Sequence, residues 1–102
     1  MKNFKNPKLN QPAIDMQLSI DQSFEAMEPY LDILESENGI LAKIMVSSLA
    51  SANLMGIANA EDLEAGIQKA SSITGIPTEI FQLHAKSTKA VFEGFIRGGE
   101  YD

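Results

Sequence analysis

The chain has 102 residues and a net charge of −6, with 44% hydrophobic residues, 22% charged residues and no cysteine. This length and composition predict one globular domain with a modest core. The absence of cysteine excludes disulfide scaffolds, thiolate catalysis and sulfur-ligated metal sites, and it fits a cytoplasmic protein.

The charge is distributed very unevenly along the chain. Residues 1–12 carry three lysines and no acid, whereas residues 13–38 carry seven acids and no base. A negative excess repels nucleic-acid phosphate and anionic lipid unless bases cluster locally. We therefore expect a protein partner or self-association, with nucleic acid disfavoured and no membrane contact.

The N-terminal segment is predicted to be an arm. Residues 1–12 are rich in Asn, Lys and Pro, which indicates a flexible or extended conformation. Over residues 13–20, apolar and polar residues alternate as in a half-buried strand. Alternatively, Pro12 opens a helix with Ile14 and Leu18 on one face. Both interpretations stay open, and a strand here would need a partner strand.

From Ile20, the apolar residues Phe24, Met27, Leu31 and Leu34 recur at the spacing of a helix and form one apolar stripe. Pro29 lies within this pattern and removes a backbone donor, so we expect a kink there. Asn38 and Gly39 are expected to end the segment. The next helix, over about residues 40–55, is apolar on nearly every side, which predicts a central helix enclosed by the others rather than a membrane span.

Two further helices complete the predicted domain. One begins after the N-cap Asn59 and ends at Gly75. Its inward residues are expected to be Leu63, Ile67, Ala70 and Ile73. The other begins at Pro77 and ends at Gly98 and Gly99. Its apolar face is expected to comprise Ile80, Leu83, His84, Val91, Phe92, Phe95 and Ile96.

The expected fold class is therefore all-α, a small bundle of four to five helices around the helix of residues 40–55. Residues 13–98 form the single predicted domain, and residues 99–102 a frayed tail.

No catalytic or metal-binding arrangement is recognisable in the sequence. The single histidine, His84, stands three residues before Ser87 on a predicted helix, without a glycine elbow or an evident orienting acid. The acids lack the spacing of a calcium loop, and neither His-Glu-x-x-His nor a phosphate loop occurs. We interpret His84 as a packing residue and expect no enzyme activity, metal, cofactor or small-molecule substrate.

Residues 70–81 have the spacing of a helix-turn-helix corner, with small Ser71 four residues before Gly75 and apolar Phe81 six residues after it. The second helix offers too few bases for several phosphate contacts, so an ordinary corner is favoured. A DNA-binding regulator using residues 66–86 is kept as the alternative.

The absence of a catalytic site favours a protein that acts by contact. We expect a small acidic interaction protein, such as an adaptor, an inhibitor or a structural subunit of a bacterial or phage assembly. The residues expected to bind the partner lie in the N-terminal third of the chain. They are Phe4, Ile14, Met16, Leu18, Asp21, Glu25, Glu28, Asp32 and Glu35.

Overall fold

The computed structural model describes residues 11–98. They form α1 (Gln11–Met27), the 3-10 turn η2 (Glu28–Tyr30), α2 (Leu31–Leu34), α3 (Glu37–Leu54), α4 (Ala60–Thr74) and α5 (Thr78–Gly98). No strand occurs among these residues, so the predicted all-α bundle is confirmed.

The ambiguous segment of residues 13–20 is helical, because it lies inside α1. The helical interpretation of this segment is thus right and the strand is wrong. The predicted arm and the tail of residues 99–102 lie outside the described residues, except for Gln11 and Pro12, which belong to α1.

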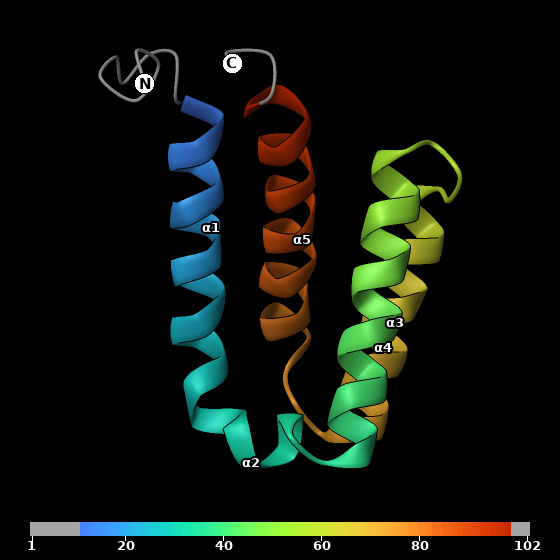
Figure 1. Ribbon diagram of the computed structural model, residues 1–102. Coiled ribbons are helices and arrows are strands. Elements are labelled where there is room, and N and C mark those ends of the chain that lie inside the picture. Colours follow the sequence, from blue (N-terminus) through green and yellow to red (C-terminus); the bar gives the residue numbers. More distant parts are fainter. Residues whose placement is uncertain (1–10, 99–102) are drawn as a thin grey trace.

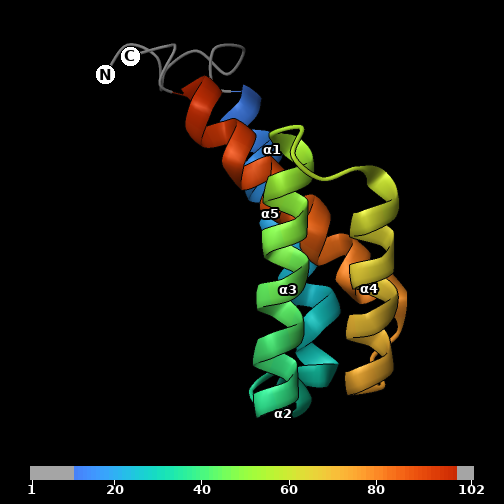
Figure 2. The same cartoon turned by 90° about the vertical axis from the view of Figure 1, so that its right-hand side faces the viewer.

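The helices form a slab that measures 46 × 30 × 19 Å. α1 packs along α5, and α3 packs against both α4 and α5. Figure 1 shows α5 between α1 on one side and the α3–α4 pair on the other, with α2 at the lower end. Figure 2 shows α3 and α4 side by side. α5 is therefore the helix with neighbours on most sides.

The break at Pro29 is confirmed, because η2 separates α1 from α2. The expected stop at Asn38 and Gly39 is wrong. Ser36 caps α3 instead, and its hydroxyl oxygen accepts a hydrogen bond from the Gly39 N–H at 3.2 Å. Gly39 is buried inside α3, where a Cβ would lie 2.1 Å from the carbonyl oxygen of Ile33. Glycine is needed here because α2 and α3 approach too closely for a side chain.

Both ends of α4 agree with the prediction. Asn59 and Asp62 form a capping box, in which each side chain accepts a hydrogen bond from the other residue's backbone N–H. Gly75 ends the helix in the left-handed conformation, with φ of 76°.

The buried apolar core joins α3, α4 and α5 to the end of α1. Its members are Met27, Leu34, Ala42, Val46, Ala50, Leu63, Ile67, Ala70, Ile76, Phe81 and Ala85. Phe81 and Ile76 are fully buried and hold the α4–α5 corner. Ile73, predicted to face inward, is more than a third exposed.

The expectation that α3 is enclosed on all sides is wrong. Its buried residues are small or medium-sized and lie along one face: Gly39, Ala42, Val46 and Ala50. Ile40, Leu41 and Ile44 are exposed. Among residues 11–98, the helices next to α3 pack against this buried face, so its other apolar side chains face solvent.

Candidate functional site

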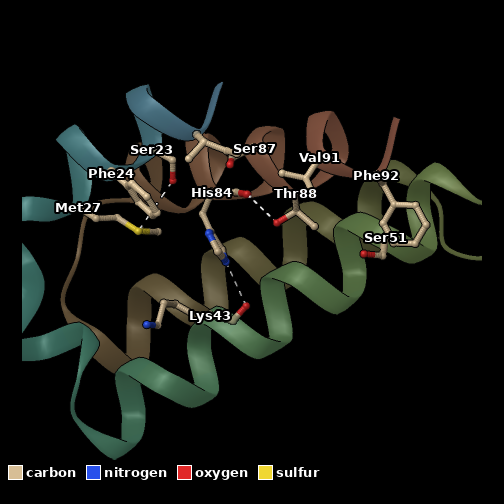
Figure 3. A pocket seen from close by; sticks show the side chains of 11 residues that line it. Ser23, Phe24, Met27, Lys43, Ser51, His84, Ser87, Thr88, Val91 and Phe92 are labelled. Carbon is tan, nitrogen blue, oxygen red and sulfur yellow. Dashed lines mark hydrogen bonds between the residues drawn. The ribbon is translucent and has the colours of Figure 1, made fainter. Parts of the chain in front are cut away.

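An apolar groove runs between α1 and α3, with α5 as its floor. Its upper hollow has a volume of about 530 Å³. Figure 3 shows Phe24 and Met27 reaching in from α1, Lys43 from α3, and His84, Thr88 and Val91 from α5. The remaining residues of the hollow are Ile20, Ser23, Ser51, Ser87 and Phe92.

A second hollow of about 450 Å³ extends the groove towards α2. It shares Phe24, Met27 and Lys43 with the first hollow. Its other lining residues are Glu28, Leu31, Leu34 and Glu35. Because three side chains line both hollows, we treat them as one continuous surface and call it the groove.

Phe24 is the most exposed of the large apolar residues that line the groove. Sequence periodicity assigns it to the packing stripe of its helix, yet 69% of its surface is accessible. The neighbouring Ser23 is buried in its place, and its hydroxyl donates to the sulfur of Met27 at 3.9 Å. The face of α1 that packs on α5 therefore includes Ser23 and Met27, and Phe24 projects at the edge of the groove. An exposed aromatic ring beside an apolar hollow is typical of a contact surface.

The floor of the groove contains a polar link between α5 and α3. The Nε2 atom of His84 lies 2.7 Å from the hydroxyl oxygen of Ser47 and 3.3 Å from the carbonyl oxygen of Lys43. With the proton on Nε2, the ring donates to the Lys43 carbonyl, which can only accept. With the proton on Nδ1, the Ser47 hydroxyl donates to Nε2 instead.

Burial, and not this link, favours the neutral form of His84. Burial lowers the pKa of His84 below its ordinary 6.5, the bond to the Lys43 carbonyl partly offsets this, and the Lys43 ammonium lowers the pKa further. In either tautomer, the contact with Ser47 joins α5 to α3.

Four of the residues predicted to bind a partner share one surface of α1. Ile14, Leu18, Asp21 and Glu25 follow one another at helical spacing and are all exposed, on the face of α1 opposite to α5. Leu18 is 55% exposed. This outward face combines two large apolar side chains with two carboxylates.

The other predicted residues are more scattered. Glu28 and Glu35 line the groove at its α2 end. Asp32 is exposed on α2, and Met16 is half-buried. Phe4 lies outside the described residues.

The sequence did not indicate the remaining groove residues as a site. Phe24, Met27, Val91 and Phe92 belong to helical apolar patterns, which do not distinguish a core from a groove. Ser23 is the residue in the sequence that could have indicated the groove. Its small side chain lets α1 pack closely on a neighbouring helix, and the ring of the adjacent Phe24 then lies outside that contact.

The α4–α5 corner has the predicted shape. Gly75 turns the chain, and the Ser71 hydroxyl donates to the Ile76 carbonyl at 2.6 Å. However, α5 packs against α1, α3 and α4, and its exposed residues include Glu79, Gln82, Lys86 and Glu93. Within residues 66–86 the exposed charged side chains are Lys69, Glu79 and Lys86, and two bases are few for several contacts with DNA phosphates.

Within residues 11–98, no three histidine, aspartate or glutamate side chains are grouped as metal ligands. The helices in this range lack the length and apolar character needed to cross a bilayer. Comparison of the chain with protein-family models, curated proteins and solved structures found no match.

Proposed function

We propose that the protein acts without catalysis, as a small acidic interaction protein that binds a segment of a partner protein in the groove. It would serve in the cytoplasm as an adaptor, an inhibitor or a structural subunit of a larger assembly. The observation that carries the proposal is the position of Phe24, an aromatic ring 69% exposed beside a hollow of about 530 Å³. Exposed aromatic residues beside apolar pockets supply much of the binding energy in protein interfaces.

The shape of the molecule supports this proposal. Within residues 11–98, α1, α5 and α3 form two walls and a floor, and no further helix covers the groove between them. Apolar groups that a closed bundle would bury therefore face the groove. Leu31, at the α2 end, is 49% exposed. Covering these groups would remove apolar surface from water, which favours association.

Site-specific photo-crosslinking in the native host tests the proposal. Phe24→benzoylphenylalanine places a photoreactive ring at the edge of the groove, and Glu64→benzoylphenylalanine places the same ring on the exposed surface of α4. We expect a discrete crosslinked product from position 24 and none of the same mass from position 64. Products that are equally abundant at both positions would contradict the proposal.

The outward face of α3 suits a second copy of the chain. Ile40, Leu41 and Ile44 are exposed there, and Lys43 is the only charged residue between Glu37 and Glu61. Two molecules that each carry a charge of −6 repel, so self-association is favoured where carboxylates are absent. We propose that this face supports self-association.

Sedimentation equilibrium tests this second proposal. The protein should associate in a concentration-dependent manner, and Ile44→Glu should shift it to monomer. Ser72→Glu, an exposed site on α4, is the matched control and should leave association unchanged. A wild-type protein that remains monomeric at the highest attainable concentration would contradict it.

The rival proposal is a DNA-binding regulator that uses residues 66–86. The geometry of the corner at Gly75 favours it, while the acids on α5 oppose it. A mobility-shift assay with mixed-sequence duplex DNA at low salt decides between the two. Binding that is lost in Lys86→Glu/Lys89→Glu would support the rival, and no binding by the wild type would remove it.

A further inference from the structure

The walls and floor of the groove consist of α-helices, the 3-10 turn η2 and the residue that follows α2. The upper hollow follows α5 from His84 to Phe92, about 12 Å at 1.5 Å per residue, and the second hollow continues to α2. Helical backbone groups are already hydrogen-bonded to one another, so the groove offers no row of free N–H and C=O groups. An extended peptide in an apolar groove would leave its own backbone unpaired, whereas a helix satisfies its backbone internally.

The two walls of the groove differ in charge. The α1–α2 wall ends in Glu28 and Glu35, and no lysine or arginine occurs from residue 9 to residue 42. All seven carboxylates of residues 13–38 are exposed. The α3 wall contributes Lys43 and uncharged residues. Glu28 and Glu35 are the carboxylates that line the groove, so the α1–α2 wall is negative at its α2 end, whereas the α3 wall carries the positive charge of Lys43.

We propose that the groove binds an amphipathic helix of a partner protein, with its apolar face on α5 and with lysine or arginine residues on the side that faces Glu28 and Glu35. This inference rests on the proposed function and adds the chemistry of the partner. The partner's apolar side chains lie against Phe24, Met27 and Val91, and its bases lie near Glu28 and Glu35. The Lys43 ammonium repels lysine and arginine on the α3 side of the groove. The basic side of the partner helix is therefore expected to face Glu28 and Glu35 rather than α3.

The test uses four fluorescein-labelled probes of 18 residues, measured by fluorescence anisotropy. Three place leucines on one helical face and fill the other face with lysine, glutamine or glutamate. The fourth is the lysine probe with two central residues replaced by proline, which prevents a continuous helix. We expect the lysine probe to bind most tightly, by about tenfold over the glutamine probe, and we expect the glutamate and proline probes to bind most weakly.

Charge-reversal variants locate the binding of the lysine probe. Glu28→Lys/Glu35→Lys should weaken it by about tenfold. Glu64→Lys/Glu93→Lys makes the same change in net charge at exposed positions of α4 and α5 that do not line the groove, and should have a much smaller effect. Lys43→Glu should strengthen binding of the lysine probe, and Phe24→Ala should weaken binding of every probe that binds. Circular dichroism spectra that match the wild type establish that each variant is folded.

The possible results separate the inference from the function on which it rests. If the lysine, glutamine and glutamate probes bind equally and Phe24→Ala weakens all three, the basic partner is wrong while docking in the groove stands. If the two double variants weaken the lysine probe equally, the attraction is a property of net charge and the inference is overturned. If Phe24→Ala changes no affinity, or if no probe binds, the helix in the groove is overturned.

Discussion

The Nε2 atom of His84 lies 2.7 Å from the hydroxyl oxygen of Ser47, which joins two residues 37 positions apart in the chain. The contact ties α5 to α3 at the floor of the groove, where the same nitrogen also meets the Lys43 carbonyl. Because α5 also packs along α1, this tie helps to set the distance between the two walls of the groove.

The first prediction concerns pH. Burial lowers the pKa of His84 in the folded protein below its ordinary 6.5, so the unfolded chain takes up a proton first as the pH falls. The stability contributed by the neutral ring is therefore complete above pH 6.5 and decreases from there down to the lowered pKa of the folded state. Urea unfolding at pH 7.5 and pH 5.5 should give a lower free energy of unfolding at the acidic pH.

His84→Gln is the control for this prediction, because glutamine does not titrate. The variant should lose the part of the pH dependence between the two conditions that comes from the imidazole. A variant whose free energy of unfolding still falls as steeply as that of the wild type would show that other groups cause the effect.

A second prediction tests the serine half of the tie. Ser47→Ala removes the hydroxyl that lies against His84 and should lower the free energy of unfolding by about 1 kcal/mol. Ser48→Ala, one position away and exposed, should change it by less than about 0.5 kcal/mol. Equal effects at the two positions would indicate that helix propensity, rather than the contact, determines the result.

Close approach of α2 and α3 leads to a third prediction. Gly39→Ala would place a Cβ 2.1 Å from the Ile33 carbonyl oxygen and 2.5 Å from the Cα of Leu34. Both atoms belong to the backbone, so we expect a loss of at least about 2 kcal/mol in the free energy of unfolding. The measurement is a urea titration monitored by circular dichroism.

Gly66→Ala is the matched control, because it makes the same change in a helix of the same fold. Its Cβ would meet only a terminal methyl group of Leu49, which can rotate away. The higher helix propensity of alanine then offsets the contact, and stability should stay within about 1 kcal/mol of the wild type. A Gly39→Ala variant as stable as Gly66→Ala would contradict the packing described for α2.

The fourth prediction separates contact residues from core residues on α1. Phe24→Ala should cost less than about 1 kcal/mol of stability, because the ring is 69% exposed. Met27→Ala, three residues on and 7% exposed, should cost about 2–5 kcal/mol. Thermal or urea unfolding measures both, and a Phe24→Ala variant as destabilised as Met27→Ala would place the ring in the core.

Signals that act locally predicted much of the fold. The caps at Asn59 and Gly75 and the break at Pro29 depend on the conformations and hydrogen bonds of neighbouring residues, which the sequence specifies directly. The interpretation of Gly39 failed because its reason is a close contact between helices. The sequence pattern alone favoured the end of a helix at Gly39, because glycine commonly ends helices in the left-handed conformation.

The groove was not predictable in the same way. An apolar side chain on a helix faces either a neighbouring helix or solvent, and the period of the sequence is the same in both cases. Leu41 and Phe24 are exposed because the slab leaves one side of α3 and one edge of α1 uncovered. That outcome depends on the arrangement of whole helices, which the sequence pattern does not specify.

An NMR titration with the leucine–lysine probe tests the central claim most directly. Backbone amide shifts of the ¹⁵N-labelled protein report every contacted residue at once. The account predicts that the largest changes cluster at the groove, around Phe24 and Met27 on α1, Lys43 on α3 and Val91 on α5, with little change along the exposed side of α4. Changes concentrated on α4, or spread evenly over all carboxylates, would contradict it.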